Sequence, residues 1–208
     1  MRKLIGRLQV LTDFDVPGDP LDAVDAALAA GAPVIQVRAK AVTDRELFAL
    51  AEAVVTRCRV AGATSLIDDR VDIALATGAD GVHLGETDLP VDVARRLLGS
   101  ASIIGATARD LAAGQARVAE GADYLGVGPT YATTTKIGLP PALGPEAVGA
   151  VAAGVSVPVI AIAGITLERV PEVLAQGVHG LAVVGAVTRA DDPGRATADL
   201  LAAIEAAP

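Results

Sequence analysis

The chain has 208 residues, 52% of them apolar, and a mean hydropathy of +0.50, a composition that supports a sizeable core and excludes a disordered polypeptide. The net charge of −8, with only two phenylalanines and two tyrosines, argues against nucleic acid as a partner, because that partner needs cationic surface and stacking side chains. The longest apolar runs, such as residues 157–165, fall well short of the roughly 20 residues of a membrane-spanning helix, so we expect no membrane partner.

Eight short apolar, β-branched runs recur along the chain, separated by alanine-rich segments with helical periodicity. In chain order, we expect strands at residues 8–11, 34–37, 65–67, 81–84, 102–106, 124–127, 159–162 and 181–184. Alternating strands and helices without a hairpin motif indicate a parallel α/β sheet with helical crossovers. Eight such units predict one single-domain (β/α)8 TIM barrel over residues 1–208, with a doubly wound open sheet as the alternative.

Short motifs ending in glycine precede the second, fourth, sixth and eighth predicted strands. They are LAAG at 28–31, LATG at 75–78, VAEG at 118–121 and LAQG at 174–177. Glycine at the end of a helix tolerates the left-handed conformation that closes it. The motifs therefore indicate a repeat unit of two strand–helix pairs, unless the same capping chemistry arose independently.

The amino-terminal residues are basic, but no long apolar region or small-residue cleavage site precedes Asp13. We therefore expect no secretory signal and a cytoplasmic location. The single cysteine, Cys58, lies in a helical pattern and is expected to be a buried thiol without a chemical role. Apolar outer helix faces are compatible with a homo-oligomer as well as with a monomer.

Polar side chains follow the carboxyl ends of the predicted strands, where (β/α)8 barrels carry their active sites. They are Gln36, Arg38 and Lys40 after the second strand, Asp68, Asp69 and Arg70 after the third, Glu86 and Asp88 after the fourth, and Thr107 after the fifth. The local cations would allow a phosphorylated ligand in spite of the acidic chain.

Two carboxylates, Asp69 and Asp88, lie in loops after adjacent predicted strands. Such a pair suits a hard cation that keeps several waters and binds a phosphate, which is the usual arrangement for Mg²⁺. The alternative is that Asp68 and Asp69 cap the helix that follows them, and that Asp88 caps the helix before which Pro90 stands.

The segment GVGPTYATTTKIG, residues 126–138, leads from an apolar strand into three threonines and a lysine. The hydroxyls of Thr133, Thr134 and Thr135 and the cation of Lys136 would offer an anion such as phosphate both hydrogen bonds and charge. An ordinary polar turn is the alternative, because threonine and glycine are common in loops.

The seventh and eighth predicted strands end in small residues, in which Gly164 and Gly185 would let backbone amides approach a phosphate. A tight turn is the alternative reading of both glycines. His83 lies inside a predicted strand and His179 before one, so neither is well placed as a catalytic base. The sequence has no Cys/His cluster for zinc, no G-x-S-x-G elbow and no Rossmann fingerprint after the first strand.

The ordered motifs resemble those of the thiamine phosphate synthase family, nearly from end to end. QVRAK at 36–40 resembles the family's Q-x-R-x-K, residues 66–90 resemble its N-D-R and L-G-x-x-D-L-P segment, and GADYLGVGPTYATTTK at 121–136 resembles its phosphate loop. VPVIAIAGI at 157–165 and GLAVVGAV at 180–187 complete the series. The family joins hydroxymethylpyrimidine diphosphate to a thiazole phosphate, with Mg²⁺, to give thiamine phosphate and pyrophosphate.

The resemblance implies a role for each matching residue. The pyrimidine diphosphate would be bound by Gln36, Val37, Arg38, Ala39 and Lys40, together with Asp68, Thr107 and Lys136. Mg²⁺ would be bound by Asp69 and Asp88. Thr133, Thr134 and Thr135, with the backbone of Gly164, Val184 and Gly185, would bind the thiazole phosphate. Arg38, Lys40, Thr107 and Lys136 would be catalytic, because the reaction chiefly requires neutralisation of the departing diphosphate.

Several positions depart from the family pattern. Asp68 replaces an asparagine, Glu86 a glutamine, Gly185 a serine, Ala163 a glycine, Ala132 a proline and Thr107 a serine. A carboxylate cannot donate a hydrogen bond as an amide does. We therefore expect that Asp68 binds a different partner from the family's asparagine, or that the affinity for the pyrimidine diphosphate is altered.

Two alternative functions follow from these departures. One is a thiazole tautomerase-like enzyme, which should need neither Asp88 nor Lys136 and in which we expect a histidine in place of Pro129. The other is a catalytically silent barrel that binds a phosphorylated thiazole or pyrimidine. Retained diphosphate affinity without pyrophosphate release would distinguish the silent barrel from the synthase.

Overall fold

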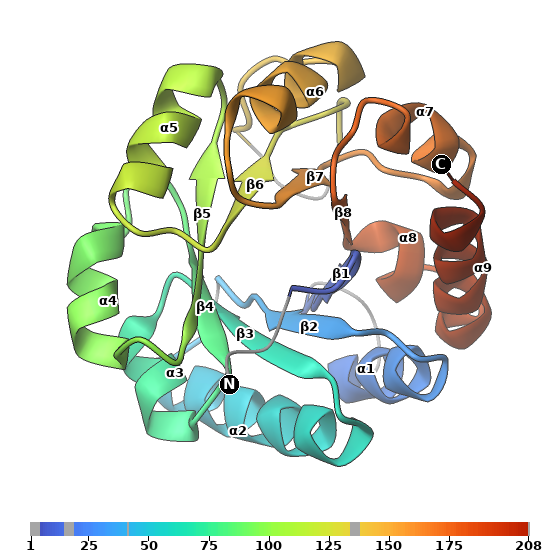
Figure 1. Cartoon of the computed structure of the whole chain (residues 1–208). Helices are drawn as coiled ribbons and strands as arrows, with labels where there is room; N and C mark the ends of the chain where they lie inside the picture. Colours follow the sequence, from blue (N-terminus) through green and yellow to red (C-terminus); the bar gives the residue numbers. More distant parts are fainter. Residues whose placement is uncertain (1–4, 15–18, 41, 134–137, 208) are drawn as a thin grey trace.

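The computed structural model describes residues 5–14, 19–40, 42–133 and 138–207. Eight parallel strands close into a barrel in the order in which they occur in the chain (Figure 1). They are β1 Leu8–Leu11, β2 Val34–Val37, β3 Thr64–Asp68, β4 Gly81–Leu84, β5 Ile103–Ala108, β6 Tyr124–Val127, β7 Val159–Ile162 and β8 Gly180–Val183. Pairing of β1 with β8 completes the ring, which confirms the TIM barrel and rules out an open sheet.

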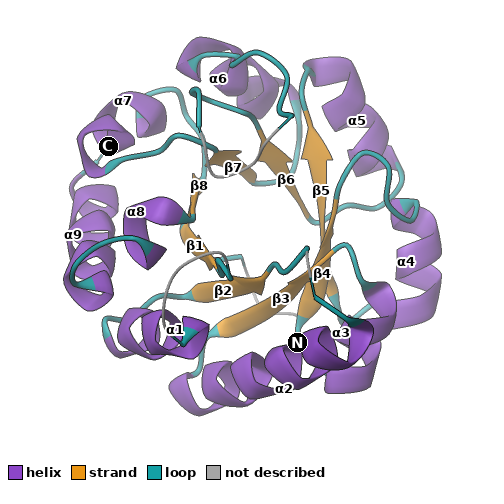
Figure 2. Cartoon of the chain, turned by 180° about the vertical axis from the view of Figure 1, so that it is seen from behind, coloured by secondary structure: helices purple, strands orange, loops and turns teal. Residues whose placement is uncertain are grey.

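Helices surround the barrel (Figure 2). They are α1 Pro20–Ala29, α2 Asp44–Ala61, α3 Val71–Thr77, α4 Val91–Leu98, α5 Leu111–Ala119, α6 Pro145–Gly154, the 3₁₀ helix η1 Leu167–Arg169, α7 Val170–Leu174, α8 Gly185–Thr188 and α9 Pro193–Ala206. Within the described residues, none of these helices is long and apolar enough to cross a membrane.

Three strands differ in extent from the sequence-based expectation. β3 and β5 run further toward the carboxyl side, because Asp68 pairs with His83 and Ala108 with Val127 of the next strand. β8 ends one residue early, because Val184 instead becomes the residue that precedes α8.

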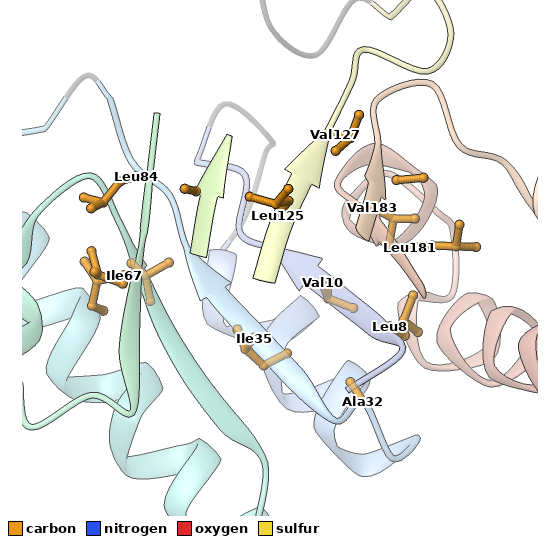
Figure 3. Packing of buried hydrophobic residues seen from close by; sticks show 14 of the residues in the cluster. Leu8, Val10, Ala32, Ile35, Ile67, Leu84, Leu125, Val127, Leu181 and Val183 are labelled. Atoms are coloured by element: carbon orange, nitrogen blue, oxygen red, sulfur yellow. The ribbon is translucent and has the colours of Figure 1, made fainter. Parts of the chain in front are cut away.

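Strand side chains point alternately outward and inward, and both directions are filled. Outward residues such as Ile35, Leu125 and Leu181 pack with helix residues in a large apolar layer (Figure 3). Cys58 of α2 is fully buried in that layer, as the sequence predicted. The inward residues form a second cluster together with Ile5, which precedes β1. The strand residues in it are Leu11, Val34, Leu66, Ile103, Tyr124, Ile160 and Ala182.

The glycine-ended motifs adopt the expected conformation. Gly31, Gly78, Gly121 and Gly177 all have positive φ angles, between 65° and 100°. In two repeats, the aspartate that follows ties neighbouring strands together. The carboxylate of Asp80 accepts the Ser65 amide at 2.9 Å, and that of Asp123 accepts the Ile104 amide at 2.8 Å.

Candidate active site

The second and third strands bring the first group of predicted residues together. The Gln36 amide nitrogen donates to Asp68 Oδ1 at 2.9 Å, and Arg38 Nε lies 3.5 Å from Asp68 Oδ2. Lys40 Nζ lies 3.5 Å from the same oxygen and also forms an ion pair with Asp69. The sequence predicted a different partner for Asp68, and the structure shows that the Asp68 carboxylate contacts the donors on β2 and in the loop after it.

Two of the residues between these donors differ in what they can offer a ligand. The Val37 side chain is fully buried in the outer apolar layer, so any contact it makes with a ligand is through the backbone. Ala39 packs against that layer from a half-buried position. The backbone around Arg38 is fixed by Thr12, whose hydroxyl accepts the Arg38 amide at 2.8 Å and donates to the Arg38 carbonyl at 3.1 Å.

Asp69 adopts a left-handed backbone conformation, with φ of 63°. Its amide donates to the His83 carbonyl at 2.8 Å, which places Asp69 beside the end of β4. Asp88 lies in the loop after β4, and its Oδ2 accepts the Gly85 amide at 2.6 Å. The two predicted metal ligands therefore come from neighbouring loops.

The helix-cap interpretation of these aspartates is wrong. α3 is preceded by Arg70 and α4 by Pro90, and neither helix has a side-chain cap at its start. Arg70 turns away from the aspartates before it in the chain and binds Asp44 and Asp72, at 2.6 Å each.

The donor set of Asp69 and Asp88 fits Mg²⁺, which takes carboxylate oxygens and leaves several positions for water and phosphate. The described part of the chain contains no cluster of three or more histidine, cysteine or acidic side chains that could hold a metal alone. A cation at this position would therefore depend on the anionic substrate for part of its coordination.

Thr107 of β5 contacts His83 of β4, which in turn contacts Tyr124 of β6. Thr107 Oγ1 lies 3.1 Å from His83 Nε2, and His83 Nδ1 lies 2.9 Å from the Tyr124 hydroxyl. Burial raises the pKa of Tyr124, and the negative charge of Asp68 raises it further, so the phenol keeps its proton at neutral pH. His83 therefore contacts Thr107, a residue predicted to bind the diphosphate.

The loop after β6 is described as far as Thr133, which is half-buried. Thr134, Thr135 and Lys136 lie outside the described residues, and their predicted phosphate contacts stay predictions. Tyr131 is held against η1 and α7, the helices that follow β7. Its hydroxyl donates to Glu172 at 2.6 Å, and the guanidinium of Arg169 lies 4.1 Å from the centre of its ring.

The backbone bends directly after β7. Ala163 and Gly164 both have positive φ, 77° and 67°, and a side chain at Gly164 would collide with the Ala132 carbonyl. The Arg169 guanidinium donates to the Gly164 carbonyl at 2.6 Å. Burial, then the Glu172 hydrogen bond, raise the pKa of Tyr131 to about 12.

Gly185 is the first residue of the short helix α8, and Val184 precedes it with a partly buried side chain. This helix is tied to the end of β1 by Arg189, whose guanidinium donates to the buried carboxylate of Asp13 at 2.9 and 3.0 Å. The ion pair of Arg189 with Asp13 thus links the segment that contains Gly185, where the phosphate is predicted to bind, to the end of β1.

Sequence reasoning missed most of the residues that support the site, namely Thr12, Asp13, Tyr124, Arg169 and Arg189, and it considered His83 only as a catalytic base. Thr12 and Asp13 directly follow β1, so the search for polar residues after strands would have found them. The contacts of His83, Tyr124 and Arg169 depend on which strands and loops become neighbours, and no local motif marks them.

These features define a class: a (β/α)8 barrel enzyme with cationic and carboxylate side chains at its strand ends. A family model described as thiamine monophosphate synthase matches residues 8–187. The chain is 50% identical over 203 residues to thiamine-phosphate synthase of Salinispora tropica, covering 96% of this chain and 98% of that protein. It is 47% identical over 195 residues to the enzyme of the same name from Chlorobium luteolum, covering 94% and 91%.

The structural comparison agrees. Thiamine phosphate pyrophosphorylase from Pyrococcus furiosus superposes with a TM-score of 0.88 at 37% identity, over 96% of this chain and 95% of that one. The chain belongs to the thiamine monophosphate synthase family.

Proposed function

We propose that this protein joins hydroxymethylpyrimidine diphosphate to a thiazole phosphate, releasing pyrophosphate and forming thiamine phosphate. The observation that carries the proposal is the grouping of Arg38 and Lys40 with Asp68 and Asp69 at adjacent strand ends, in a chain of this family. Neither the tautomerase-like nor the silent alternative has support from the relatives named above.

In the reaction, the bond between the pyrimidine methylene carbon and a diphosphate oxygen breaks, and its electrons leave on the diphosphate. The thiazole nitrogen donates its lone pair to that carbon and forms the new carbon–nitrogen bond. The protein therefore needs to hold the two reactants in line and to stabilise the growing negative charge of the leaving group.

Arg38 and Lys40 would supply that charge stabilisation. Both are paired with carboxylates in this structure, so a bound diphosphate would compete with Asp68 and Asp69 for them. Thr107, together with Lys136, would add further contacts to the diphosphate. Mg²⁺ bound by Asp69 and Asp88 would neutralise part of the diphosphate charge.

The thiazole phosphate would bind between the loops after β6, β7 and β8. Thr133, with Thr134 and Thr135, would supply hydroxyl donors, and the backbone at Gly164, Val184 and Gly185 would supply amide donors. The contacts of Arg169 with Gly164 and Tyr131 link the loops after β6 and β7.

A product assay tests the proposal. Purified protein is incubated with both substrates and Mg²⁺, and the joined product is identified by mass spectrometry, with controls that omit each component in turn. Product that depends on both substrates and Mg²⁺ is the expected result. A folded protein that binds either substrate and yields no product would contradict the proposal.

A further inference from the structure

Polar side chains on three neighbouring strands form a continuous chain inside the barrel. Tyr124 of β6, fully buried, contacts His83 Nδ1 at 2.9 Å, and His83 Nε2 contacts the hydroxyl of Thr107 at 3.1 Å. Only Thr107 among these three was assigned a ligand contact. The other two connect that hydroxyl to the barrel interior.

Two glycines make room for this chain. Gly105 pairs with both His83 and Tyr124 in the sheet register, and a side chain there would overlap the Tyr124 ring. Gly126 pairs with Thr107, and a Cβ atom there would lie 2.8 Å from His83 Cε1. Because glycine weakens a strand interior, its use at both positions points to the close approach of these two rings.

The direction of the hydrogen bonds decides what Thr107 can offer a ligand. A neutral imidazole has one donor nitrogen and one acceptor nitrogen. If Nδ1 accepts from Tyr124, then Nε2 carries the proton and donates to the Thr107 oxygen, and the Thr107 proton is available for an anion. In the opposite tautomer, Thr107 would donate to His83, and its oxygen would face the anion without a proton.

The surroundings of Tyr124 favour the first direction. The buried amide nitrogen of Gln9 has no hydrogen-bond partner among the described residues, and the Gln9 side chain lies close enough to the Tyr124 hydroxyl to lower its pKa. Amide nitrogen and oxygen are interchangeable by a flip of the side chain. With its nitrogen turned toward the phenol oxygen, Gln9 would gain a partner, and Tyr124 would donate its own proton to His83 Nδ1.

We propose that Tyr124 and His83 are positioning residues that hold the Thr107 hydroxyl as a hydrogen-bond donor toward the departing diphosphate. The role in turnover rests on the proposed function, whereas the orientation of the hydrogen bonds does not. His83 acts in this proposal through Thr107 and has no part in transferring a proton to the substrate.

The tautomer is measured directly by nitrogen-15 NMR of the imidazole rings. The chain has only two histidines, and His179→Gln assigns their signals. We expect the proton of His83 on Nε2 in the wild-type protein, and a loss of this preference in Tyr124→Phe. A wild-type His83 that carries its proton on Nδ1 would overturn the proposal, whether or not the protein is a synthase.

Kinetics then test the link to turnover. We expect Tyr124→Phe and Thr107→Val each to lower kcat about tenfold, the typical effect of one hydrogen bond to a charged group, with KM for the pyrimidine diphosphate changed less. Thr107→Ser should keep most of the activity. The double variant Tyr124→Phe/Thr107→Val should be no slower than Thr107→Val alone, because both act through one hydroxyl. Effects that multiply in the double variant would contradict the proposal.

If the protein has no synthase activity, the proposed function is wrong. The positioning role of His83 and Tyr124 can then still be tested by the binding of pyrophosphate. Pyrophosphate with Mg²⁺ should shift the His83 signals and leave those of His179 in place. Pyrophosphate that binds without perturbing His83 would overturn the contact through Thr107.

Discussion

Among the residues predicted to depart from the family pattern, Asp68 has the clearest structural consequence. Its carboxylate accepts from Gln36 and lies 3.5 Å from both Arg38 Nε and Lys40 Nζ, which are the cations proposed for the diphosphate. An asparagine would keep the acceptor for Gln36 and remove the competing charge.

We therefore expect Asp68→Asn to bind pyrophosphate up to about 5-fold more tightly, since partly exposed ion pairs contribute up to roughly 1 kcal/mol. Isothermal titration calorimetry measures this without Mg²⁺. Asp72→Asn is the matched control, because Asp72 pairs with Arg70 away from these cations. Weaker binding to Asp68→Asn would show that the carboxylate supports the site and does not compete with the ligand.

Asp69 is predicted to be a metal ligand, and its substitution should change the Mg²⁺ requirement. Asn tolerates the left-handed backbone found at this position, so Asp69→Asn should fold. We expect the Mg²⁺ concentration for half-maximal activity to rise at least about tenfold, because a neutral amide is a weaker ligand for a hard cation. Asp92→Asn, whose carboxylate pairs with Arg96 on α4, should leave the titration unchanged. If the Mg²⁺ titrations of the two variants coincide, Asp69 is not a metal ligand.

At the residue scale, the sequence identified side chains whose position after a strand is sufficient to place them. Gln36, Arg38, Asp68 and Lys40 are examples, and the structure brings them into contact. The partnership of His83 with Tyr124 was not predictable, because it spans 41 positions and depends on the register of three strands.

At the scale of elements, the loop after β7 is held by Arg169. Its guanidinium binds the Gly164 carbonyl and covers the Tyr131 ring, so it links two loops proposed to bind the thiazole phosphate. We expect Arg169→Met to raise KM for the thiazole phosphate about 5- to 10-fold, because the loss of one hydrogen bond and one cation–π contact loosens that turn. The value of kcat should change little. Arg195→Met on α9 is the control, and an unchanged KM in Arg169→Met would contradict this role.

Ala163 is one of two described non-glycine residues with positive φ, and its φ is 77°. An alanine in the left-handed conformation costs about 1–2 kcal/mol, and glycine would remove this cost. Glycine also gives the unfolded chain more conformational entropy, which cancels part of the gain in stability. Ala163→Gly should therefore raise the free energy of unfolding by up to about 1 kcal/mol, measured by urea denaturation. A less stable variant would show that the turn is not strained at Ala163.

The elements themselves were predictable where composition and turn residues agree. Five of the predicted strands have the observed bounds, and the glycines that end α3 and precede β2, β6 and β8 are left-handed as expected. The ends of β3, β5 and β8 were not fixed by the sequence, because pairing with the next strand and the start of α8 decide them.

For the whole molecule, closure of the barrel depends on ties between successive strands. Asp123 accepts the Ile104 amide and pairs with Arg95 at 2.6 Å, and its side chain is 14% exposed. Asp123→Asn should lower the free energy of unfolding by about 2 kcal/mol, because it leaves the Arg95 charge poorly compensated. Urea denaturation is compared with Asp199→Asn, an exposed helix pair on α9. Equal stability of the two variants would contradict this structural role.

The barrel as a whole followed from the number and spacing of strand–helix units, because eight parallel units of this length close most readily into a ring. The site inside it was predictable only in part. Long-range contacts such as Arg189 with Asp13 join residues 176 positions apart, and they exist only because β8 pairs with β1.

The most direct test of the central claim is simultaneous quantification of pyrophosphate and thiamine phosphate produced from both substrates and Mg²⁺. The wild-type protein should form them in equal amounts over many turnovers, and Arg38→Met should slow both to the same extent. Pyrophosphate released without joined product, or neither product from a folded protein that binds the substrates, would contradict the assignment of this chain as a synthase.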